Sequence, residues 1–149
     1  MPSFDLTIKI EHILTFLTVI VALLVAFVAY RQYNLANAKL KFDLFEKRFA
    51  IFMAVQSFLL DILSKANVTT DRRVQFLRET QYSAFLFEDD IIKFLKELDN
   101  KALEYYINKS KPQTPEVIRI GLEFYEWFER EHKRLLEIFS QYLKFKTWK

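Results

Sequence analysis

The stretch ILTFLTVIVALLVAFVAY, residues 13–30, carries no charged side chain. An α-helix of this length is about 27 Å long, close to the thickness of the hydrocarbon core of a bilayer. A small water-soluble domain would have difficulty enclosing such a helix on every side. The sequence therefore predicts a transmembrane helix over residues 13–30, preceded by a short extracytoplasmic segment at residues 1–12.

A cleaved signal peptide is the main alternative for this stretch. Such a peptide has a basic start, a shorter apolar run and small residues before the cleavage point. Residues 1–12 hold one lysine and two acidic residues. Cleavage after Ala29 would put Phe27 where a small residue is needed, and cleavage after Ala26 would put Leu24 there. We therefore expect the helix to be retained as an anchor.

The basic residues on either side of the apolar stretch predict its orientation. Only Lys9 precedes it, whereas the residues that follow include Arg31, Lys39, Lys41, Lys47 and Arg48. Because lysine and arginine accumulate on the cytoplasmic side, residues 31–149 are predicted to lie in the cytoplasm. The expected residues of the membrane interface, where anionic head groups attract basic side chains, are Tyr30, Arg31, Tyr33, Lys39 and Lys41.

Small side chains recur along the apolar stretch at Thr18, Ala22 and Ala26, one turn apart. Such a stripe allows two membrane helices to approach closely, and these residues are therefore candidates for helix packing in the membrane. Ordinary use of alanine is the alternative explanation.

The rest of the chain has few residues that break helices. No glycine or proline lies between Ser3 and Lys111, and cysteine is absent. After residue 30 the helical pattern continues as a seam at alternating steps of three and four: Leu35, Ala38, Phe42, Phe45, Phe49, Phe52, Gln56, Leu59 and Leu63. A second apolar line widens this face: Leu44, Ile51, Val55, Phe58 and Ile62. A face this wide and rich in phenylalanine favours a bundle over a two-stranded coiled coil.

Three further helices are predicted beyond this seam. The second runs from about Asp71 to Phe87, with Val74, Leu77, Gln81, Ala84 and Phe85 at helical spacing. The third follows from Asp89 to about Asn108, and the last runs from Pro115, capped by Thr114, to about Phe145. The predicted fold is all-α, an N-terminal transmembrane helix continuing into a cytoplasmic bundle of about four helices over residues 31–149.

No group of residues in the sequence predicts catalysis, a cofactor or a metal. A single glycine excludes the common phosphate-binding loops, and His12 and His132 offer no set of three or four metal ligands. We expect no enzyme activity and no small-molecule substrate. We also expect no nucleic-acid binding, because acidic residues are interleaved with the basic ones. The tail KFKTWK, residues 144–149, suits a membrane interface, with a frayed end as the alternative.

The aromatic segments resemble those of a group of small bacterial single-pass membrane proteins of uncharacterised function. The matching residues are KFDLFEKRFAIF (residues 41–52), Phe85, Leu86 and Phe87 ahead of Glu88, Trp127 and Phe128, and Phe139 with Tyr142 and Leu143. Glu88 stands where the group's pattern has glycine. The resemblance implies a location in the bacterial inner membrane, and some relatives belong to phage-defence loci.

Three functions remain open from the sequence. The first is a non-catalytic interaction module, an adaptor or oligomerising domain that is held at the lipid bilayer and binds a protein partner or a second copy. The second is a membrane-perturbing effector of the phage-defence type, which the small-residue stripe would serve. The third, an enzyme, lacks any supporting group of residues.

Overall fold

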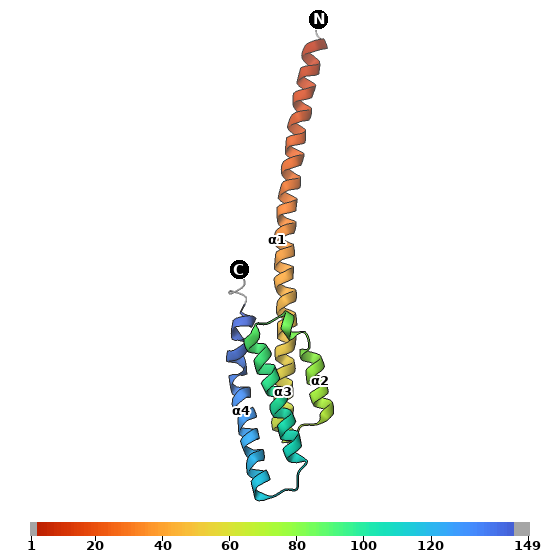
Figure 1. Ribbon diagram of the computed structural model, residues 1–149. Coiled ribbons are helices and arrows are strands. Elements are labelled where there is room, and N and C mark those ends of the chain that lie inside the picture. The colour runs from red at the N-terminus through yellow and green to blue at the C-terminus, as the bar shows by residue number, and fades with distance from the viewer. Residues whose placement is uncertain (1–2, 145–149) are drawn as a thin grey trace. The chain divides into compact units, whose positions relative to one another are not determined.

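The computed structural model describes residues 3–144, with the side chains of residues 11–144. Its elements are helices: α1 (Ser3–Lys65), α2 (Thr70–Thr80), the short 3₁₀ helix η1 (Ser83–Phe85), α3 (Asp89–Lys109) and α4 (Pro115–Leu143) (Figure 1). The predicted all-α fold and the four α-helices are confirmed. The chain divides into two compact units, Met1–Phe42 and Asp43–Lys149, and each is described by itself.

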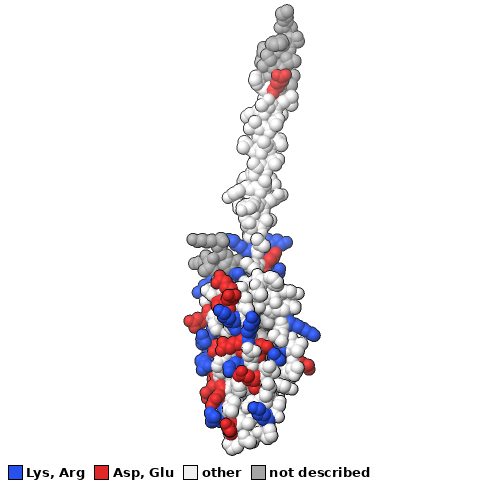
Figure 2. Space-filling view, in the orientation of Figure 1, with Lys and Arg blue, Asp and Glu red and all other residues white. Residues whose placement is uncertain are grey.

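The first unit is the long N-terminal part of α1. Without glycine or proline nothing in its sequence interrupts the helix, and all side chains of residues 11–36 are exposed. Figure 2 shows the apolar stretch as a surface without lysine, arginine, aspartate or glutamate. No second helix accompanies α1 among the described residues of this unit.

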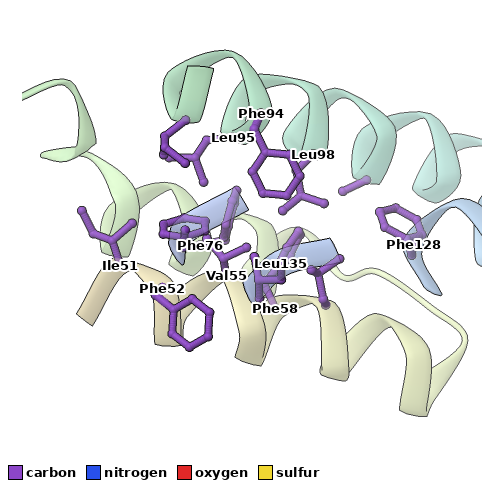
Figure 3. Packing of buried hydrophobic residues seen from close by; sticks show 14 of the residues in the cluster. Ile51, Phe52, Val55, Phe58, Phe76, Phe94, Leu95, Leu98, Phe128 and Leu135 are labelled. Carbon is purple, nitrogen blue, oxygen red and sulfur yellow. The ribbon is translucent and has the colours of Figure 1, made fainter. Parts of the chain in front are cut away.

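The second unit encloses a hydrophobic core between the C-terminal part of α1 and the helices α2, α3 and α4. From α1 the core takes residues on both predicted apolar lines, among them Phe52 and Phe58. Phe58 stacks on Phe76 of α2 with ring centroids 4.3 Å apart, and Phe139 of α4 meets Phe52 edge-on at 5.6 Å. Figure 3 shows Phe52, Phe58 and Phe76 in one cluster with buried side chains of α3, among them Phe94, Leu95 and Leu98. The wide inner face predicted for α1 is therefore confirmed from residue 51 onward.

The residues of the predicted seam differ in exposure along α1. Leu35, Phe42 and Phe49 are all exposed, whereas Phe52, the next seam residue, is buried. Of the predicted seam, Phe52 and Leu59 lie in the core of the second unit. A helical period shows which side chains share a face, and it does not show how many neighbouring helices the face receives.

The second helix is shorter than predicted: α2 ends at Thr80, and not at Phe87. Of the residues at helical spacing, Val74, Leu77 and Phe85 are exposed, whereas Phe76, which is not among them, is buried. The chain turns through η1, where the amide of Phe87 donates to the carbonyl of Ser83 at 3.0 Å. Because of this turn, the Phe87 ring lies in the core. Its packing there outweighs the local propensity of the sequence to continue the helix.

The boundaries of the other helices follow local chemistry. The hydroxyl oxygens of Thr69 and Thr114 accept hydrogen bonds from the first turns of α2 and α4, as helix caps do. α3 begins at Asp89, as predicted. After α1, Ala66 adopts a left-handed conformation with φ 47°, and its carbonyl accepts a hydrogen bond from the Tyr105 hydroxyl at 2.8 Å. That contact satisfies one of the carbonyls left open near a helix end.

Candidate functional site

The apolar stretch of α1 is the first candidate site. In the part of the chain that the structure describes, α1 is the one helix long and apolar enough to cross a membrane. The side chains from residue 13 to residue 30 are all exposed. The hydroxyls of Thr15 and Thr18 donate to the carbonyls of Glu11 and Leu14, each at 2.8 Å. These bonds back to the helix satisfy both hydroxyls without water.

The predicted interface residues follow directly on α1. Tyr30, Tyr33, Lys39 and Lys41 are all exposed. The guanidinium group of Arg31 lies over the Phe27 ring, 5.7 Å from its centroid, one turn back along the helix. Through this cation–π contact, Arg31 packs on the last turn of the apolar stretch. Contact of these residues with lipid stays a prediction.

The predicted packing stripe lies on the uncovered part of α1. Thr18, Ala22 and Ala26 follow one another at four-residue steps of a continuous helix, and all three are exposed. Residues at this spacing share one face of a helix. The stripe therefore exists as a surface, and its packing against another helix stays a prediction.

An apolar cleft on the second unit is a second candidate site, which the sequence analysis missed. It has a volume of about 480 Å³ and lies between α1, the end of α2 and η1, lined by Lys47, Ala50, Ile51, Glu79, Tyr82, Phe85 and Leu86. Phe85 is 85% exposed and Tyr82 is 62% exposed. Neighbouring exposed aromatic side chains of this kind mark surfaces that bind other proteins. The sequence does not indicate this cleft, because Phe85 fits the period of a longer helix.

The contacts of Arg48 fix the position of Leu86 and Phe87, the residues that follow η1. Its Nε donates to the Leu86 carbonyl at 2.8 Å, and its guanidinium lies over the rings of Phe87 and Tyr142, at 5.8 and 5.5 Å from their centroids. Burial lowers the pKa of Arg48, although the nearby Tyr142 and Glu88 oppose this shift. The residue after η1 is thus fixed to α1 by a charge-assisted hydrogen bond.

The arginines of α2 form ion pairs inside the second unit. Arg72 donates to Asp61 of α1 at 2.5 Å, and this hydrogen bond is the largest cause of the lowered pKa of the Asp61 carboxyl. Arg73 donates to both carboxylate oxygens of Asp99 at 2.6 and 2.9 Å, and the contact raises the pKa of Arg73. These two arginines therefore attach α2 to α1 and α3.

A charged groove lies between α3 and α4. It has a volume of about 520 Å³, and its lining includes Asp90, Lys93, Glu97, Glu131 and Arg134. Glu131 is buried and accepts hydrogen bonds from Arg134 at 3.1 and 3.2 Å. Among the described residues no three histidine, cysteine, aspartate or glutamate side chains converge in a way that could hold a metal. The buried Glu131 carboxylate is thus paired with an arginine of the same helix.

Comparison with known proteins adds no relative. No family model matches this chain, no curated protein matches it, and no solved structure matches it. The resemblance to small bacterial membrane proteins stays a prediction. Residues 145–149 of the aromatic and basic tail lie outside the described residues, and so does its predicted contact with the membrane interface.

Proposed function

We propose that this protein is a membrane-anchored helical interaction module, in which residues 13–30 span a lipid bilayer and the unit Asp43–Lys149 binds a protein partner. One observation carries the proposal. The apolar stretch of α1 is exposed throughout, while the second unit encloses a core of its own. Such a stretch is stable in lipid and strongly disfavoured in water. Each methylene group that moves from water into an apolar environment gains about 0.8 kcal/mol.

The flanking charges support a cytoplasmic location for the bundle, with the N-terminus on the other side of a bacterial inner membrane. Arg31, Lys39 and Lys41 all follow the apolar stretch, and basic residues near a membrane helix are retained on the cytoplasmic side. Tyr30 and Tyr33 stand beside them, as aromatic residues do at the boundary between lipid and water.

The apolar cleft supports the binding of a partner by the second unit. Phe85 stands out from it with Tyr82 as its neighbour, and Arg48 holds the following residue in place. An exposed aromatic side chain beside an apolar cleft is suited to anchor a partner in a hydrophobic interface.

Membrane insertion is tested by fractionation of cells that produce the full chain. We expect the wild-type chain to stay in the membrane pellet at high pH and to be released only by detergent. Val21→Arg places a charge at the centre of the stretch, which costs about 3 kcal/mol on insertion scales, and we expect it to reduce the membrane fraction. Val74→Arg, at an exposed position of α2, is the matched control. A wild-type chain that stays soluble without detergent would contradict the proposal.

Partner binding is tested with the same membranes. Covalent cross-linking followed by affinity purification is expected to recover a discrete complex from cells with the wild-type chain, and Phe85→Ser should reduce its yield by at least tenfold. Leu136→Ser, at an exposed position of α4, is the control and should leave the yield unchanged. Equal yields from both variants would show that the cleft does not bind the partner.

The alternative function, a membrane-perturbing effector, has less support. A pore requires polar groups that face its lumen. The two threonine hydroxyls within residues 13–30, Thr15 and Thr18, are both engaged by carbonyls of their own helix. A membrane-potential dye in cells that overproduce the chain tests this alternative, because an effector would depolarise them.

A further inference from the structure

We propose that the second unit binds a small aromatic carboxylate in a cleft at one end of the bundle. The turn after α1, the end of α3 and the first half of α4 meet there (Figure 1) and form a cleft of about 210 Å³. We call it the tyrosine cleft, and its lining includes Tyr105, Asn108, Lys109, Val117, Gly121 and Tyr125. Binding at this place goes beyond the proposed function and depends neither on the membrane anchor nor on the apolar cleft beside η1.

Gly121 is the only glycine of the chain, and it lies inside the helix α4. Glycine is a poorer helix former than alanine, so it lowers the stability of the helix. A Cβ atom at this position would meet the amide nitrogen of Asn108 at 3.4 Å, which is an ordinary contact distance. Packing within the chain therefore leaves room for alanine, and the glycine instead widens the cleft. A residue that weakens its own helix without a gain in packing is typical of a functional site.

Hydrogen bonds within the chain fix the walls of the tyrosine cleft. The hydroxyl of Tyr105 donates to the Ala66 carbonyl at 2.8 Å, and the hydroxyl of Tyr125 donates to a carbonyl of α1 at 3.2 Å. The buried amide of Asn108 donates to the Val117 carbonyl of α4 at 3.0 Å. Walls held in this way need little reorganisation when a ligand binds, and tyrosine rings offer an aromatic ligand surfaces on which to pack.

The charge in the tyrosine cleft indicates the class of ligand. Among the described residues that line the cleft, Lys109 alone is charged, and no carboxylate lines the cleft beside it. Its ammonium group lies over the Tyr105 ring, 5.6 Å from the centroid. Because Lys109 is exposed, a carboxylate could pair with it at the rim while an apolar ring lies against Gly121. The cleft is smaller than the range of about 300–1,000 Å³ for drug-sized ligands, which favours a ligand with a single ring.

Binding is tested with the full chain in detergent, labelled with [15N]glycine. Because the chain has one glycine, its spectrum contains one amide signal, which reports on the wall of the cleft. We expect 4-fluorobenzoate to shift this signal saturably, with a Kd of about 1 mM, as suits a ligand of this size. The uncharged 4-fluorobenzyl alcohol should bind about tenfold more weakly, the lower end of the effect of a hydrogen bond between charged groups. The absence of a saturable shift with 4-fluorobenzoate, or equal affinity for the two compounds, would overturn the proposal.

Gly121→Ala separates ligand binding from folding. We expect a higher midpoint of thermal unfolding, because alanine favours the helix. The added methyl group occupies part of the cleft and should weaken binding by about tenfold, as measured from the 19F signal of 4-fluorobenzoate. Ser140→Ala, on α4 and outside the cleft, is the control and should leave binding unchanged. A lower midpoint would show that packing within the chain requires the glycine, and unchanged binding would show that the ligand lies elsewhere. Either result overturns the proposal.

Lys109→Gln tests the pairing of the carboxylate with the ammonium group. It removes the charge from the rim of the cleft and should weaken the binding of 4-fluorobenzoate by about tenfold, with little change for 4-fluorobenzyl alcohol. Lys111→Gln removes an exposed lysine that does not line the cleft, and we expect it to bind both compounds as the wild type does. Equal affinity of the two variants for 4-fluorobenzoate would contradict the assignment of a carboxylate ligand.

Discussion

The hydroxyl of Tyr142 donates a hydrogen bond to the carboxylate of Asp90, with 2.6 Å between the two oxygens. This contact joins the last turn of α4 to the first turn of α3, and Arg48 of α1 lies over the same tyrosine ring. Burial, together with the hydrogen bond to Asp90 and its negative charge, raises the pKa of Tyr142 to about 12. The phenol therefore remains protonated and donates at every physiological pH.

Loss of this hydroxyl should weaken the second unit. We expect Tyr142→Phe to lower the free energy of unfolding at pH 8 by about 1 kcal/mol, the usual contribution of one such hydrogen bond. Unfolding of the detergent-solubilised chain by denaturant, followed by the fluorescence of Trp127, measures the change. Tyr106→Phe, at an exposed position, is the control and should change little.

The difference in stability between the wild type and Tyr142→Phe should also depend on pH. The pKa of Tyr142 is raised in the folded state relative to an unfolded value of about 10, so its stabilising contribution is fully present below pH 10 and is lost as the pH rises towards 12. The advantage of the wild type over Tyr142→Phe should therefore shrink between pH 10 and pH 12. A constant difference across this window would contradict the raised pKa.

Phe58 lies at the centre of the core, fully buried and stacked on Phe76. Phe58→Ala should lower the free energy of unfolding by about 3–5 kcal/mol, because it removes buried apolar area and leaves a cavity. Leu60→Ala, two residues away at an exposed position, should cost less than about 1 kcal/mol. Equal effects in denaturant unfolding would show that the two residues do not differ in burial.

Ala66 adopts a left-handed conformation, with φ 47°, at the end of α1. This conformation costs an alanine about 1–2 kcal/mol and a glycine almost nothing. After the greater flexibility of glycine in the unfolded chain is subtracted, Ala66→Gly should stabilise the protein by about 0.5–1 kcal/mol. A higher midpoint of thermal unfolding would confirm this. Asn67→Gly, at a neighbouring position where φ is not positive, should lower the midpoint.

Arg48 should control the mobility of the segment after η1. Arg48→Lys keeps the charge but loses the planar group that bonds the Leu86 carbonyl and lies over two aromatic rings. We expect a loss of about 1–2 kcal/mol and faster hydrogen exchange at the amide of Phe87. Arg78→Lys, at an exposed position of α2, should leave this exchange rate unchanged. Unchanged exchange in Arg48→Lys would mean that the turn is held by the packing of Phe87 alone.

Local chemistry made several parts of the fold predictable. The hydroxyl of Thr114 ahead of Pro115 marked the start of α4, because it accepts a hydrogen bond from an amide of the first turn. The acidic pair that begins at Asp89 marked the start of α3, because negative charge is favoured near the N-terminus of a helix. The period of α1 correctly placed Val55 and Phe58 in the core. These features depend on residues within a few positions of one another.

The end of α2 and the cleft beside it could not be predicted in this way. The place of Phe87 depends on Arg48 and on Tyr142, which lies 5.1 Å away between ring centroids. Both residues are distant from Phe87 in the sequence. The helical period of the sequence continues past the end of α2, although the contacts of Phe87 with Arg48 and Tyr142 turn the chain there. For this reason the sequence did not predict that Phe85 is exposed.

The sequence by itself determined the helical nature of this protein and the uncharged stretch at residues 13–30, because periodicity, breaking residues and hydropathy act between near neighbours. Only the tertiary structure decided which part of the α1 seam is covered. Phe52 is buried and meets Phe139 of α4 edge-on, whereas Leu35 and Phe42 on the same seam are exposed. The number of neighbours that a helical face receives depends on contacts between distant segments, and no local pattern records it.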